Sequence, residues 1–142
     1  MDLLGFEDEI QTKGEWVKIP VTVDSGAGES VTKRGTFPHK IKNTKKTGFG
    51  YKVANDQILY NEGEQQVFGL TEEGLHACIA FQVTDVHKSL LAVSQATDMD
   101  NTVVSSNKYC SSLQDNKSGH RTPLRRENGV YIFGLWVFTR QE

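Results

Sequence analysis

Apolar and polar side chains alternate along residues 16–23. Val17, Ile19, Val21 and Val23 occupy every second position, so in an extended chain their side chains project from the same face. This pattern predicts a β-strand with one face turned toward the protein core.

Most of the remaining chain consists of short apolar segments separated by turn-forming residues. Residues 49–54 and 57–60 flank Asn55 and Asp56, both of which tolerate left-handed backbone, and this predicts a hairpin with the two residues at its tip. A second turn is predicted at residues 71–74. The further strands that the pattern predicts are residues 66–70, 75–86, 102–105, 109–113, 121–124 and 130–137.

One segment has the spacing of a helix instead. Within residues 89–98 the apolar positions are Leu90, Leu91, Val93 and Ala96, which predicts a short amphipathic helix. Many short strands with one short helix favour an all-β domain, built as a closed barrel or as a sandwich.

Composition limits the possible classes of protein. The chain has 142 residues, enough for one core, and its net charge of −2 gives no general attraction to nucleic acid or membranes. No apolar run has the length of a membrane span, and the acidic N-terminal segment lacks the basic start of a signal peptide. Cys78 and Cys110 are the only cysteines, and we expect them to be free thiols in a reducing, intracellular compartment.

Basic residues gather in one part of the chain, between positions 33 and 46, with no acidic residue among them. A nucleic-acid contact and a solvated loop are the two interpretations. The solvated loop is favoured, because Phe37 is the only Phe, Tyr or Trp in this stretch, so we expect no nucleic-acid partner for this domain. The histidines lie far apart and the cysteines lack ligand spacing, so neither a metal nor a cofactor is expected.

The strongest chemical pattern is Asp24-Ser25-Gly26-Ala27, which directly follows the predicted strand of residues 16–23. A carboxylate at the end of an apolar strand is costly unless it has partners. One explanation is the dyad of an aspartic protease, in which two carboxylates share one proton, one activates a water and the other protonates the scissile carbonyl. One chain supplies one such Asp, so this explanation requires a two-fold homodimer.

Residues 22–27, Thr-Val-Asp-Ser-Gly-Ala, resemble the signature of retropepsins. The order of the later segments is similar to that in the proteases of copia-type retrotransposons and of related retrotransposon-like polyproteins from dinoflagellate algae. These segments are the predicted hairpin, Phe81-Gln82-Val83-Thr84-Asp85-Val86, Ser89-Leu90-Leu91-Ala92-Val93-Ser94-Gln95 and Thr102-Val103-Val104. Gly129-Val130-Tyr131-Ile132 also resembles the segment that follows the protease there, and the likeness covers about residues 15–137.

The resemblance implies an aspartic endopeptidase that processes a retrotransposon polyprotein in the cytoplasm or in a virus-like particle. It implies a retropepsin-like β fold with a flap hairpin, and roles for individual residues. Asp24, Ser25 and Gly26 would form the catalytic turn, and Leu90-Leu91 would pack beneath it. The residues expected to contact the polypeptide substrate are Ala27, Gly28 and Glu29 in the loop, and Val53, Ala54, Asn55 and Asp56 in the flap.

The resemblance also divides the chain into a polar lead-in or linker at residues 1–14, a protease domain at 15–98, and a β extension at 99–142 that packs on the same domain. Two departures stand out. Gly28 occupies the position where retroviral enzymes have an Asp that holds substrate backbone, and Ala92 replaces a Gly in the apolar motif.

The motif has other interpretations. A phosphorylation-dependent recognition motif is disfavoured, because such motifs work in flexible segments and this one follows a predicted core strand. Asp24 could simply cap a turn at a strand end. A phosphate-binding loop is rejected, because Glu29 stands where such a loop needs Lys. A catalytically silent protease-like domain that serves assembly or binding stays open as the alternative function.

Overall fold

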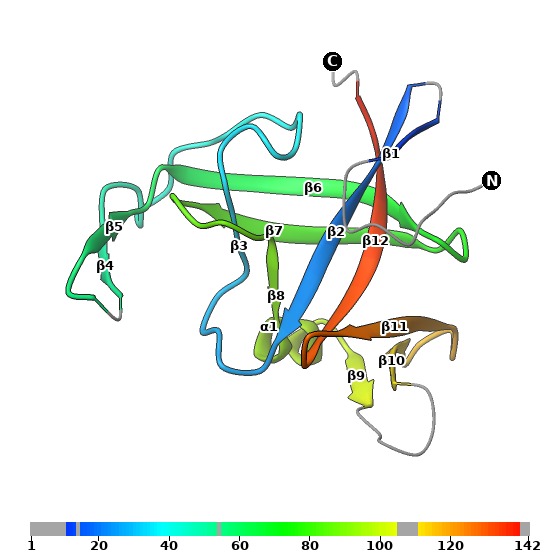
Figure 1. The fold of residues 1–142 in the computed structure, drawn as a ribbon. Helices are drawn as coiled ribbons and strands as arrows, with labels where there is room; N and C mark the ends of the chain where they lie inside the picture. Colours follow the sequence, from blue (N-terminus) through cyan, green and yellow to red (C-terminus); the bar gives the residue numbers. More distant parts are fainter. Residues whose placement is uncertain (1–10, 14, 54, 105–110, 140–142) are drawn as a thin grey trace.

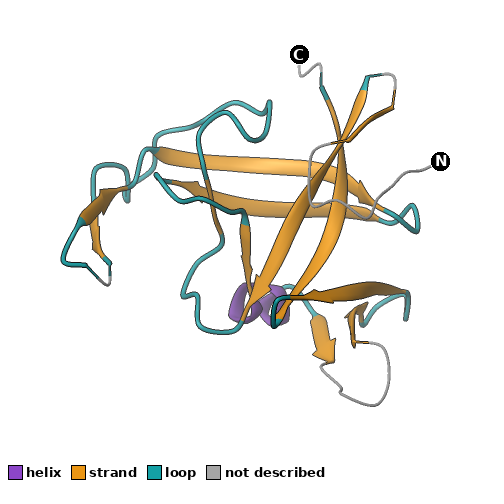
Figure 2. Ribbon diagram, viewed as in Figure 1, coloured by secondary structure: helices purple, strands orange, loops and turns teal. Residues whose placement is uncertain are grey.

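The computed structural model describes residues 11–13, 15–53, 55–104 and 111–139. These residues form mostly β-strands, with one short helix among them (Figures 1 and 2). The elements are β1 (Gln11–Lys13), β2 (Trp16–Asp24), β3 (Val31–Thr32), β4 (Gly50–Lys52), β5 (Ile58–Tyr60), β6 (Gly63–Thr71), β7 (His76–Val83), β8 (Leu90–Ala92), α1 (Val93–Asp98), β9 (Asn101–Val104), β10 (Ser111–Asp115), β11 (Arg121–Glu127) and β12 (Val130–Phe138).

Strand β2 is the centre of the fold, and its alternating pattern explains why. Ile19 and Val21 are buried in the core, as the sequence predicted for this face. The other face is also partly covered, since Lys18 and Thr22 are buried as well. Along its length β2 pairs antiparallel with β12, and its last residues pair in parallel with β8.

All strands except the β4–β5 hairpin belong to one mixed sheet, in the order β1-β2-β8-β3-β7-β6-β12-β11-β10-β9. Because β2 pairs with β12 in addition to β8, the sheet bends back on itself as a partial ring. Figure 1 shows β2 and β12 side by side, crossing the long β6–β7 pair. The ring encloses one buried apolar cluster: Ile19, Val21, Phe37, Val67, Ile79, Phe81, Leu91, Ala96, Leu124, Phe133, Leu135 and Val137.

Glycines allow the turns and the close crossing that this ring requires. Gly74 has a φ of +83° in the predicted turn between β6 and β7. At Gly69 a Cβ would lie 2.6 Å from the Trp136 carbonyl oxygen and 2.9 Å from Leu135 Cγ. Any other residue at position 69 would therefore push β12 away from β6.

The helix prediction for residues 89–98 was wrong over its first part. Leu90–Ala92 form strand β8, and the helix α1 begins at Val93. The cause is tertiary: the backbone of β8 pairs with both β2 and β3, and the buried Leu91 joins the core. Apolar periodicity alone does not distinguish a short buried strand from a helical turn.

Both ends of the described chain pack on β2. Strand β1, which the sequence did not predict, pairs with residues 16–18, and β12 pairs with β2 from Trp16 to Val23. The four later strands predicted between residues 102 and 137 correspond to β9–β12, with shifted ends, and residues 105–110 lie outside the described residues. Within the described ranges no helix is long and apolar enough to cross a membrane.

Candidate functional site

Asp24 is the last residue of β2, and its side chain is half-buried. The backbone N–H of Gly26 donates a hydrogen bond to Asp24 Oδ1 at 2.8 Å, which closes a tight turn around the carboxylate. A Cβ at position 26 would lie 3.3 Å from the same oxygen, closer than most side-chain contacts. A larger residue at position 26 would therefore displace the Asp24 carboxylate by a few tenths of an ångström.

Ser30 fixes the other end of the loop that begins at Asp24. It has no exposed surface, and its hydroxyl oxygen accepts a hydrogen bond from the Ala92 N–H at 3.0 Å. Its carbonyl accepts from the Gln82 N–H at 2.8 Å, and its own N–H donates to Gln95 Oε1 at 3.3 Å. The loop of residues 25–29 is thus held at both ends, while Ser25, Gly26 and Gly28 are exposed.

Strand β8 lies between the two strands that this loop connects. It pairs in parallel with β2, with Asp24 opposite Ala92, and it meets β3 at Val31. The loop from β2 to β3 must therefore cross the C-terminal end of β8. A buried hydrogen bond between the hydroxyls of Thr32 and Ser89, 2.7 Å apart, fastens β3 beside β8. Leu90-Leu91, expected beneath the loop, are part of this strand.

Glu29 forms an ion pair with Lys46, which belongs to the segment before the β4–β5 hairpin. The hydrogen bond from Lys46 to Glu29 raises the pKa of the Lys46 ammonium. A polar cavity of about 270 Å³ lies beside this pair, lined by the loop, by β7 and by α1. Lys33 and Arg34 of the basic segment also pair with carboxylates of the chain, those of Asp85 and Glu62.

The predicted hairpin is present as β4 and β5, and it forms a small sheet of its own that projects from the main sheet (Figure 1). Asp56 has a φ of +63°, as its position at the tip predicted, and Asn55 Oδ1 accepts a hydrogen bond from the Gln57 N–H at 3.1 Å. Val53 donates and accepts the backbone hydrogen bonds that close the turn, and Ala54 lies outside the described residues. Exposed apolar side chains of this region are Phe49, Ile58 and Tyr60.

Asn61 anchors the hairpin to the main sheet, although sequence reasoning gave it no role. Its side chain is buried, and its Nδ2 donates to the Tyr51 hydroxyl at 2.7 Å and to Gln82 Oε1 at 2.9 Å. Its Oδ1 accepts from the Gly63 N–H at 2.8 Å. Asn61 thereby ties the base of the hairpin to β7.

The structure brings some predicted site residues together and keeps others apart. Asp24 to Glu29 form one continuous loop, whereas Val53, Asn55 and Asp56 belong to the separate hairpin. Within the described part of the chain, no hydrogen bond or ion pair joins Asp24 to the hairpin. Glu29 of the loop pairs with Lys46, which lies in the segment before the hairpin. Gln82 of β7 also bonds both Ser30, at the end of the loop, and Asn61, at the base of the hairpin.

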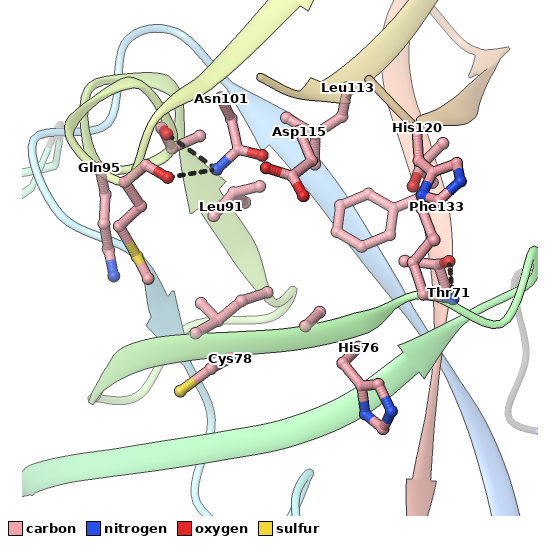
Figure 3. Close-up of a pocket in the computed structure, with 16 residues that line it drawn as sticks. Thr71, His76, Cys78, Leu91, Gln95, Asn101, Leu113, Asp115, His120 and Phe133 are labelled. Carbon is pink, nitrogen blue, oxygen red and sulfur yellow. Dashed lines mark hydrogen bonds between the residues drawn. The ribbon is translucent and has the colours of Figure 1, made fainter. Parts of the chain in front are cut away.

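A second cavity, of about 230 Å³, lies between β7 and the C-terminal strands (Figure 3). Leu91 and Phe133 provide apolar lining, and Asp115 contributes a carboxylate. Hydrogen bonds from the Ser118 hydroxyl and the Lys117 N–H lower the pKa of Asp115. In Figure 3 the side chains of His76 and Cys78 turn away from Asp115, so these residues do not form a nucleophile–base–acid arrangement.

Comparison of the chain with protein-family models, curated proteins and solved structures found no significant match. Among the residues that the structure describes, no group of His, Cys, Asp and Glu side chains is arranged to hold a metal ion. The loop itself offers the carboxylates of Asp24 and Glu29, the Ser25 hydroxyl and backbone amides.

Proposed function

We propose that this protein is an aspartic endopeptidase of the retroviral type, related to copia-type retrotransposon proteases, and that it acts as a homodimer. The observation that carries the proposal is the position of Asp24: a carboxylate at the end of a buried strand, in a turn that is closed by Gly26 and anchored at Ser30. A group held in this way is positioned for chemistry at the surface of the domain.

Each chain contributes one Asp24, and two chains related by a two-fold axis would bring the two carboxylates to within about 3 Å of each other. At that distance both cannot be ionised, so the pair holds one proton. The ionised carboxylate accepts a proton from a water held between them, and the protonated carboxylate donates to the carbonyl oxygen of the scissile bond.

The β4–β5 hairpin supports the same function. It projects from the main sheet and exposes Ile58 and Tyr60, which a bound peptide would cover. Hairpin backbone and extended peptide backbone are complementary in their hydrogen bonds, so a polypeptide is the substrate class that such an element would enclose. The substrate would be the polyprotein that contains this domain.

A catalytically silent domain is the second candidate, and one observation favours it. Gly28 has no side chain with which to hold substrate, and the carboxylate of the following Glu29 is already paired with Lys46. A protease-like β domain with these changes could serve assembly or binding. The two candidates differ in whether dimers cleave peptides.

Substitution of the proposed catalytic residue tests the proposal. Asn has nearly the shape of Asp, so Asp24→Asn should keep the fold and the dimer, but it cannot accept a proton from water. We expect cleavage of a peptide library by the wild-type protein at mildly acidic pH, where the pair holds one proton, and loss of cleavage by about 1000-fold or more in the variant.

Asp85→Asn is the matched control, because Asp85 is exposed and lies outside the loop and the hairpin. It should cleave like the wild type. Equal cleavage by Asp24→Asn would refute the role of Asp24, and no cleavage by wild-type dimers would favour the silent domain.

A further inference from the structure

Gln95 connects the Asp24 loop to the body of the sheet with both ends of one side-chain amide. Its Oε1 accepts a hydrogen bond from the Ser30 N–H at 3.3 Å, and its Nε2 donates to the Ala80 carbonyl oxygen at 3.0 Å. The two partners determine the orientation of the amide, since an N–H requires an acceptor and a carbonyl requires a donor. Gln95 therefore joins the loop to β7 in only one arrangement.

The same short segment of chain holds Ser30 twice. Ala92, at the end of β8, donates its N–H to the Ser30 hydroxyl oxygen, and Gln95, in the first turn of α1, accepts from the Ser30 N–H. Gln95 also separates the two cavities, since its side chain lines both the polar cavity beside Glu29 and the cavity of Figure 3. Loss of its amide would leave the Ser30 N–H without this acceptor and would remove the tie from the loop to the Ala80 carbonyl.

We propose that Gln95 is a positioning residue for Asp24, acting through Ser30. The inference rests on the proposed function, because positioning has meaning only if Asp24 reacts. Ser30 ends the loop that Asp24 begins, so a shift at Ser30 moves the turn that orients the Asp24 carboxylate toward its partner. Displacement of a reacting group by about 1 Å costs roughly 100-fold in rate.

Two variants of Gln95 test this inference. Gln95→Leu keeps the size of the side chain and removes both hydrogen bonds. Gln95→Glu keeps the acceptor for Ser30, but its ionised form places a carboxylate oxygen against the Ala80 carbonyl, whereas its protonated form can donate there. Gln66→Leu is the matched control, because Gln66 is exposed on β6.

The measurement is kcat for each active site, with sites counted by titration with a tight-binding peptide analogue of the tetrahedral intermediate. We expect kcat per site to fall by about 10- to 100-fold in Gln95→Leu, with KM within about twofold of the wild-type value. Gln66→Leu should match the wild type. In Gln95→Glu, kcat relative to wild type should recover as the pH falls and the new carboxyl group is protonated.

Wild-type kcat per titrated site in Gln95→Leu would overturn the inference, and so would a loss that lies only in the number of titratable sites. If Gln95→Leu does not fold, Gln95→Glu decides: a ratio to wild type that does not change with pH would overturn the inference. Absence of cleavage by the wild-type dimer would instead overturn the proposed function, and the role of Gln95 with it.

Discussion

Ser30, Asn61 and Gln65 are polar side chains with almost no exposed surface, and each is hydrogen-bonded to a distant segment of the chain. Gln65 Nε2, for example, donates to the carbonyl oxygens of Phe37 and His39 at 3.2 and 2.6 Å. Buried groups of this kind lose much free energy when a partner is removed. At the scale of single residues, Ser30 holds the end of the Asp24 loop, Asn61 holds the base of the β4–β5 hairpin, and Gln65 holds the segment of Phe37 and His39.

His39 is also buried, and its imidazole can take up a proton. Its Nε2 accepts a hydrogen bond from the Phe68 N–H at 3.2 Å, and its Nδ1 is buried without a partner among the described residues. Burial lowers the pKa of His39 below its ordinary value of 6.5, because the charged imidazolium would lose its hydration. A proton on Nε2 would also remove the acceptor that Phe68 uses.

The lowered pKa makes stability depend on pH. Between the folded-state pKa and 6.5, the unfolded chain binds more protons at His39 than the folded protein does. The contribution to stability is therefore complete above pH 6.5 and is lost as the pH falls through the lowered pKa. His39→Gln, whose amide oxygen can still accept from Phe68, should flatten this dependence.

Denaturant unfolding at a series of pH values from about 7.5 to about 5.5 measures the effect. The free energy of unfolding should fall more steeply toward low pH in the wild type than in His39→Gln. His87 is exposed, so His87→Gln should keep the wild-type slope. Identical slopes for wild type and His39→Gln would show that His39 is not the group responsible.

At the scale of elements, local patterns predicted most of the strands and where two of the turns lie, but they did not predict β1, β3 or β8. The alternation in β2, the left-handed Asp56 and the turn at Gly74 all follow from residue type. The error at Leu90–Ala92 and the roles of Ser30, Asn61 and Gln95 arise from contacts between segments far apart in the sequence. No local signal distinguishes such a serine or glutamine from one on the surface.

The β4–β5 hairpin has features of a mobile element. It pairs over only residues 50–52 and 58–60, outside the main sheet, whereas β2 is flanked by β8 and β12 and buries Ile19 and Val21. Elements with few buried contacts open locally more often than core strands. We therefore expect backbone amides of the hairpin to exchange with solvent roughly 100-fold faster, or more, than those of β2.

Hydrogen exchange of the unliganded protein measures this difference, with the β6–β7 hairpin as an internal control because it belongs to the main sheet. The β6–β7 amides should exchange as slowly as those of β2. A non-cleavable peptide should slow exchange in the β4–β5 hairpin. Equal protection of β2 and the free β4–β5 hairpin would argue against its role as a flap.

At the scale of the whole molecule, the pairing of β2 with β12 bends the sheet into a partial ring, and the Asp24 turn lies at one end of β2. The chain contains one such turn, so the proposed chemistry requires two chains. Ser25, Gly26 and Gly28 of the loop are exposed, so this loop is accessible to a second copy. Activity should therefore depend on whether both chains of a dimer carry Asp24.

Mixing of wild-type and Asp24→Asn subunits tests the shared site most directly. The two proteins are mixed in equal amounts, allowed to exchange subunits, and assayed at a total concentration above which activity per chain no longer rises. If a site needs one Asp24 from each chain, the mixture should have about a quarter of the activity of wild-type protein at the same total protein concentration. Only about a quarter of the dimers in the mixture carry two Asp24 residues. Activity of about half would mean that each chain acts alone, and would contradict the account.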